Sequence, residues 1–144
     1  MDDPHDLKRF VDAQRDVYAL ALSEIVAGRK RTHWMWYVFP QVAGLGSSPK
    51  AKRYAIRSKA EALAYVGHPV LGPRLLEIAQ AALAVSGRTA HEIFGSPDDA
   101  KLRSCATLFA SVLPPGSVFD QLLVKYFAGA RDERTIDLLE TSIP

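Results

Sequence analysis

The residues best suited to chemistry form a glycine- and serine-rich loop, "GLGSSPK", and the basic segment that follows it. Glycines let backbone N–H groups approach a ligand, serine hydroxyls donate hydrogen bonds, and Lys and Arg bind phosphate or carboxylate. The residues predicted to bind an anion here are Gly44, Gly46, Ser47, Ser48, Lys50 and Arg53. The spacing is not that of a Walker A loop. A turn followed by a capped helix is the simpler interpretation of the same residues.

The distribution of charge also favours an anionic partner. The net charge is only +2, yet residues 25–60 contain eight Lys or Arg and no Asp or Glu. Residues 1–24 have six acids against three bases, and residues 61–144 have ten acids against seven bases. A stretch without carboxylates concentrates positive potential unless folding brings acids over it. The predicted ligand is a phosphate-bearing small molecule, and the alternative is a nucleic acid or acidic protein bound by the basic face.

An aromatic run, "THWMWYVFP", precedes the loop. Trp34 and Trp36 are candidates to stack on a ligand, and Gln41 is a candidate hydrogen-bond partner, although aromatic residues at this density more often form core. His33 is a weak candidate for a catalytic base, beside the simpler interpretation of a histidine that backbone groups satisfy. The remaining histidines lack metal-ligand spacing, so no metal site and no cofactor are predicted. Reaction type, ligand identity and oligomeric state do not follow from the sequence.

The elements that position these residues are predicted to be helices. Apolar residues at helical spacing indicate one or two helices between Leu7 and Ile25. Ser–Pro and capping-box patterns predict further helix starts at Ser48–Pro49, Ser58–Glu61, Thr89–Glu92 and Ser96–Pro97. Thr32 to Phe39 is the hardest segment to assign: we expect two helical turns, capped by Thr32 and buried on nearly every face, with a strand or irregular segment left open. The predicted fold is all-α, a single domain over residues 1–144 with about seven helices and no β-sheet.

Composition limits the class of protein. The single cysteine, Cys105, cannot form an internal disulfide, which favours a reducing cytoplasm. The acidic, polar start "MDDPHDLKRF" is not a signal peptide, and no apolar run approaches the length of a membrane span. We therefore expect a soluble cytoplasmic protein that is not associated with a membrane.

The chain resembles a bacterial family of proteins of unknown function, the one numbered eighteen-ten, whose members sometimes carry the label calpastatin. The resemblance rests on the blocks "DLKRFVDAQ", "GRKRTHWMWYVFPQVAGLGSS", "AYVGHPVLGPRL", "IFGSPDDAKLRSCATLFA" and "KYFAGARDERTIDLL", which extend over nearly the whole chain. It implies an all-helical single domain and no established activity. The calpastatin label transfers nothing, because the chain contains no inhibitor repeat.

Overall fold

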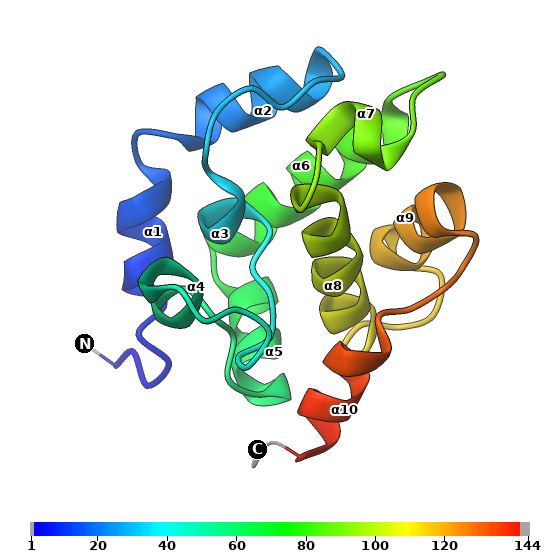
Figure 1. Cartoon of the computed structure of the whole chain (residues 1–144). Coiled ribbons are helices and arrows are strands. Elements are labelled where there is room, and N and C mark those ends of the chain that lie inside the picture. The colour runs from blue at the N-terminus through cyan, green and yellow to red at the C-terminus, as the bar shows by residue number, and fades with distance from the viewer. Residues whose placement is uncertain (1, 142–144) are drawn as a thin grey trace.

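The computed structural model describes residues 2–141, and these residues form ten helices (Figure 1). Their bounds are α1 Lys8–Gln14, α2 Tyr18–Val26, α3 Met35–Val38, α4 Pro49–Arg53, α5 Lys59–Gly67, α6 Leu71–Ala84, α7 Ala90–Phe94, α8 Asp98–Ala110, α9 Val118–Phe127 and α10 Glu133–Thr141. The all-α prediction is confirmed, but the expected number of about seven helices is too low. Several helices have only one or two turns, because capping residues and glycines follow one another closely along the chain.

Local capping explains most of the helix starts. The Ser48 hydroxyl accepts a hydrogen bond from the Ala51 N–H, and Pro49 occupies the first position of α4. The capping box predicted at Thr89 is complete, since the hydroxyl and the Glu92 carboxylate each accept from the other's backbone N–H. Among residues 2–141 the only β pairing is an isolated parallel bridge between residues 42 and 56.

Three local predictions are wrong in detail. The aromatic segment forms the single turn of α3, and Thr32 does not cap it because the Thr32 hydroxyl donates to Glu24. At the start of α5, Ser58 accepts from the Glu61 N–H as predicted, but the Glu61 carboxylate binds arginines instead of returning to the Ser58 backbone. Helix α8 begins one residue later than expected, with Pro97 at the N-cap.

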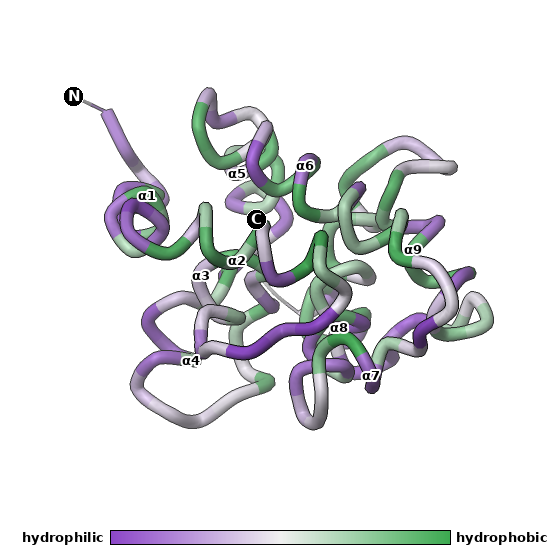
Figure 2. The backbone as a smooth tube through the Cα atoms, turned by 90° about the horizontal axis from the view of Figure 1, so that it is seen from above, coloured by the Kyte–Doolittle hydropathy of each residue, from purple (hydrophilic) through white to green (hydrophobic). Residues whose placement is uncertain are grey.

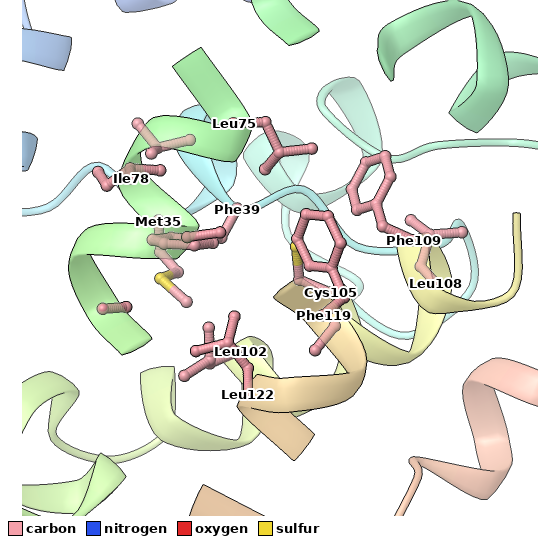
Figure 3. Packing of buried hydrophobic residues seen from close by; sticks show 14 of the residues in the cluster. Met35, Phe39, Leu75, Ile78, Leu102, Cys105, Leu108, Phe109, Phe119 and Leu122 are labelled. Atoms are coloured by element: carbon pink, nitrogen blue, oxygen red, sulfur yellow. The ribbon is translucent and has the colours of Figure 1, made fainter. Parts of the chain in front are cut away.

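Helices α6 and α8 lie at the centre of the core. Helix α6 packs against α2, α5 and α9, and α8 packs against α5, α7, α9 and α10. Figure 3 shows Met35 and Phe39, from the start and end of the aromatic segment, among the core side chains that α6, α8 and α9 contribute. The aromatic segment is therefore fixed by the centre of the molecule, as its apolar composition predicts.

Helix α1 closes the core on the side of the aromatic segment. Figure 2 views α1 nearly along its axis and shows that the helix contains both hydrophilic and hydrophobic residues. Phe10 packs edge-on against Tyr65, with the ring centroids 5.1 Å apart. The buried Gln14 amide donates to the Tyr37 carbonyl at 2.7 Å and to the Tyr65 hydroxyl at 3.0 Å. These contacts fix α3 to α1. None of the helices over residues 2–141 is long and apolar enough to cross a membrane.

Candidate functional site

A buried carboxylate organises the chain where it enters the aromatic segment. One Glu24 oxygen accepts from the Arg31 N–H at 2.9 Å, the Thr32 N–H at 3.1 Å and the Trp34 indole N–H at 2.8 Å. The other accepts from the Thr32 hydroxyl at 2.7 Å. Burial disfavours the charged form, but the hydrogen bonds outweigh it and hold the pKa of Glu24 at about 2. The carboxylate is therefore ionised at neutral pH and fixes residues 31–34.

A buried ion pair organises the chain where it leaves the glycine-rich loop. Arg9 and Glu61 meet at 2.7 Å, with only 5% and 1% of their side chains exposed. Arg9 also donates to the carbonyl of Arg53 at 2.7 Å and to that of Ala55 at 2.8 Å. The bridge between residues 42 and 56 closes the base of the loop through two backbone hydrogen bonds of 2.8 Å. The loop that carries α4 is thus held at both ends.

The two tryptophans of the aromatic segment have different surroundings. Trp34 is 1% exposed, and its ring packs 6.2 Å from Phe39. Trp36 is only partly buried. The expectation that residues 32–39 are buried on nearly every face is therefore only partly correct: Thr32 and His33 are exposed, and Trp36 and Tyr37 are partly buried. Trp34 belongs to the core, and Trp36 is the tryptophan that can contact a ligand.

Two adjacent hollows meet at Trp36 and at Lys101 of α8. We call the first the loop hollow; its volume is about 290 Å³, and it is lined by Trp36, Gln41, Leu45, Gly46, Ser47, Ser48, Ala51 and Lys101. We call the second the α8 hollow; its volume is about 220 Å³, and it is lined by Lys30, His33, Met35, Trp36, Ser96, Pro97, Asp98 and Lys101. The two hollows share one side chain from the aromatic segment and one from α8.

The loop hollow brings together five of the nine residues proposed as ligand-binding from the sequence, namely Trp36, Gln41, Gly46, Ser47 and Ser48. Within the described part of the chain, the side chains of Gln41 and Ser47 make no hydrogen bond to the protein and so are available to a ligand.

The other four proposed residues lie outside the lining of the loop hollow. Trp34 is buried, and Lys50 stands beside Trp36 instead of in the lining. Gly44 packs under Leu138 of α10 and has a φ of 102°. The Arg53 guanidinium lies over the Tyr54 ring, 5.6 Å from its centroid. These placements put Trp34, Gly44 and Arg53 away from the lining of the loop hollow.

Two ammonium groups stand beside the Trp36 ring. The Lys50 Nζ is 5.2 Å and the Lys101 Nζ 5.0 Å from the ring centroid, within cation–π range. Lys50 has no carboxylate within 4.0 Å among residues 2–141, whereas Lys101 has Asp98 at 3.4 Å. The basic segment is only partly neutralised, through the pairs Lys30–Asp98 and Arg57–Glu61. Positive charge is therefore left over at the hollow.

Nothing in the sequence indicates Lys101 as a site residue, and Asp98 is a candidate catalytic carboxylate by residue type but is assigned a structural role. The sequence pattern predicts Asp98 to be an ordinary aspartate in the first turn of a helix. It predicts Lys101 to lie on the exposed face of the same helix. No local pattern joins them to the aromatic run, which lies about 60 residues earlier in the chain. The signal that the sequence did contain is the absence of acids from residues 25–60, because any basic side chain of that stretch that becomes buried needs an acidic partner from elsewhere in the chain.

His33 and Cys105 are two side chains whose chemistry could serve catalysis, and their surroundings differ. His33 is exposed at the α8 hollow, and its side chain has no hydrogen-bond partner in the described part of the chain. Cys105 is buried in the core, and burial raises the pKa of its thiol well above the ordinary value, so the thiol stays protonated. Over residues 2–141, no three His, Cys, Asp or Glu side chains gather as a metal ion would need.

The loop hollow depends on the absence of a side chain at Gly46. A Cβ there would stand 2.6 Å from the Ala51 Cβ. We expect Gly46→Ala to lower the free energy of unfolding by about 1–2 kcal/mol, because the loop must shift to relieve the overlap. The control is Gly67→Ala, where an added Cβ meets nothing within 4 Å. Chemical denaturation of both variants tests this, and equal stabilities would contradict the close approach of the loop to α4.

Comparison with known proteins gives a family and a close structural relative. A family model described as "Protein of unknown function (DUF1810)" matches residues 4–139. The chain is also similar to the conserved hypothetical protein Rv1873 from Mycobacterium tuberculosis, whose crystal structure was solved at 1.38 Å, with 54% sequence identity. That similarity covers 97% of this chain and 100% of the other, with a TM-score of 0.95. No curated protein matches the sequence. The chain belongs to the DUF1810 family of proteins of unknown function.

Proposed function

We propose that the protein binds a small phosphate-bearing anion in the loop hollow. One observation carries the proposal: the ammonium groups of Lys50 and Lys101 both lie within about 5 Å of the centroid of the Trp36 ring, and Trp36 lines a concave surface. Two positive charges beside a hollow of this size suit one phosphate group better than they suit a flat partner surface.

The polar groups of the hollow match the needs of a phosphate. Phosphate oxygens accept hydrogen bonds, and the Ser47 hydroxyl, the Gln41 amide and the two lysines are donors. Helix α4 has five residues and its Ser48 hydroxyl already accepts from Ala51, so we assign no binding role to the end of this helix. The lysines and the free side-chain donors support the proposal, and the helix end does not.

The loop is held in place before any ligand arrives. The Glu24 carboxylate fixes the chain before Trp36, and Arg9 fixes the chain after α4. A site built on a restrained segment loses less conformational entropy when it binds, so more of the interaction energy appears as affinity.

Binding should depend on the two lysines at the hollow and not on basic charge in general. We expect Lys50→Ala combined with Lys101→Ala to weaken the binding of inorganic phosphate and phosphate monoesters at least about tenfold, because each lost charge-assisted hydrogen bond contributes about 1.5–3 kcal/mol. The matched control is Lys52→Ala combined with Lys59→Ala, which removes the same charge from exposed positions that neither line a hollow nor stand beside the Trp36 ring. The measurement is calorimetry or ligand-observed NMR at low salt.

The control also tests the alternative function. If both double variants weaken binding equally, the basic face acts as a whole, which favours a nucleic acid or acidic protein partner. Absence of binding to the wild-type protein contradicts the anion site. We assign no reaction to the hollow, and His33 stays a weak candidate for a catalytic base. A cytoplasmic location likewise stays a prediction.

A further inference from the structure

The α8 hollow lies directly beside the proposed phosphate site and has a carboxylate in its lining. Asp98 Oδ2 is 2.7 Å from the Lys30 Nζ, in a pair whose side chains are 5% exposed at the lysine and 18% exposed at the aspartate. Asp98 Oδ1 is 3.4 Å from the Lys101 Nζ, a looser contact. Both hollows thus share Lys101, which touches the carboxylate of one and borders the other.

Lys30 fixes Asp98 through Oδ2, and the other oxygen, Oδ1, is contacted more loosely by Lys101. Lys30 also donates to the Thr32 carbonyl at 2.6 Å and lies 5.0 Å from the centroid of the Trp34 ring, so its position is determined by buried partners. Lys101 has the longer contact to Asp98 Oδ1, and its ammonium group lies 5.0 Å from the centroid of the Trp36 ring. A phosphate in the loop hollow attracts Lys101, and Asp98 Oδ1 then becomes free to accept a hydrogen bond from a ligand.

We infer that the α8 hollow holds the hydroxyl-bearing part of the same ligand, so that the protein binds a phosphate ester of a sugar or polyol. This inference rests on the proposed phosphate site. A carboxylate repels phosphate and accepts hydrogen bonds from hydroxyl groups, so the two hollows differ in the chemistry that they accept. The Trp36 ring has both lysine ammonium groups over it, which leaves it less suited to stack a nucleobase. The sugar therefore provides the recognised hydroxyl groups, whether it is free or part of a nucleotide.

The test compares ligands with and without the hydroxyl-bearing part. Calorimetry at low salt would measure inorganic phosphate, ribose 5-phosphate and adenosine 5′-monophosphate against the wild-type protein, Asp98→Asn and His33→Ala. We expect both phosphate esters to bind more tightly than inorganic phosphate. Asp98→Asn should weaken the esters about tenfold, the effect of losing a hydrogen bond to a charged group, and leave inorganic phosphate unchanged or bound more tightly.

The exposed His33 provides a second variant that does not disturb the buried Lys30. His33→Ala should reduce ester affinity without changing phosphate affinity, since the ring lines only the α8 hollow. Equal affinities for ribose 5-phosphate and adenosine 5′-monophosphate would indicate that the protein recognises the sugar phosphate and not the adenine base. Inorganic phosphate that binds as tightly as both esters, or an unchanged preference in both variants, overturns the inference while the phosphate site stands. If no ligand binds, the proposed function itself is wrong.

Discussion

Replacing Arg9 with Met is expected to lower the free energy of unfolding by about 3–5 kcal/mol, the usual cost of removing one partner of a buried ion pair. Glu61 would keep only Arg57, whose side chain is 62% exposed and lies 3.2 Å from the carboxylate. The carbonyls of Arg53 and Ala55 would each lose a donor at the same time. The loss is large because one guanidinium satisfies a carboxylate and several carbonyls together.

The neighbouring lysine provides a matched control for the Arg9 substitution. Lys8 forms an ion pair with Asp12 at 3.0 Å, but 76% of the lysine side chain is exposed. Lys8→Met should therefore change stability by less than about 1 kcal/mol, as exposed pairs do. Urea denaturation followed by circular dichroism measures both variants. Equal effects of the two substitutions would show that the Arg9–Glu61 pair is not buried as described.

A double variant separates the effect of the unpaired buried charge on stability from the effect of lost packing. Arg9→Met with Glu61→Met removes both charges and supplies apolar atoms of similar length. We expect it to be more stable than Arg9→Met alone, because the isolated buried carboxylate is the main source of the loss. A double variant less stable than either single variant would instead assign the loss to the carbonyls that Arg9 satisfies.

Local patterns in the sequence predicted much of the fold, because helix caps act over three or four residues. Ser48, Ser58 and Thr89 each accept from the backbone N–H three residues later, as their patterns indicate. The same reasoning assigned Glu61 to a capping box. One oxygen of its carboxylate instead accepts from Arg9, 52 positions earlier in the chain, and the other accepts from the backbone N–H and the side chain of Arg57. The charged hydrogen bond to the buried arginine is the stronger interaction.

The sequence predicted only part of the candidate site, because sequence patterns describe contacts between residues that are close along the chain. The loop residues from Gly46 to Ser48 and Trp36 are near one another in sequence, and they line one hollow. Lys101 and Asp98 reach this region through the packing of α8 in the core, which no local pattern encodes. The absence of acids from residues 25–60 was nevertheless informative, because the acids that flank this stretch, Glu24 and Glu61, are the carboxylates that hold it in place.

Replacing Glu24 with Ala is expected to lower the free energy of unfolding by about 3–4 kcal/mol. Trp34 is 1% exposed, so its indole N–H would be left without an acceptor, and a buried unpaired donor costs about 1–3 kcal/mol. The N–H groups of Arg31 and Thr32 would lose the same acceptor, at a smaller cost because both residues are exposed and water can replace it. Thermal or chemical denaturation measures the loss.

Glutamine at position 24 should be much less harmful than alanine. Three of the four hydrogen bonds reach a single Glu24 oxygen, and the glutamine carbonyl, an acceptor with two lone pairs, keeps most of this interaction at the same position. The fourth comes from the Thr32 hydroxyl, which can rotate and accept from the glutamine amide instead of donating. We expect Glu24→Gln to cost about 1 kcal/mol, the difference between charged and neutral acceptors. Alanine and glutamine variants of equal stability would contradict this hydrogen-bond arrangement.

The Glu24→Gln variant also tests how the stability of the protein depends on pH. The pKa of Glu24 lies at about 2 in the folded protein, against an ordinary value of 4.5. Because the folded value is the lower one, the stabilisation is fully present above pH 4.5 and is lost as the pH falls towards 2. Glu24→Gln should remove this part of the acid sensitivity, whereas Glu140→Gln, at an exposed position in α10, should retain it. Denaturation midpoints of the three proteins between pH 7 and pH 2 test the expectation. An unchanged acid profile in Glu24→Gln would mean that this carboxylate does not hold the entry to the site, and that the segment before Trp36 is fixed by core packing alone.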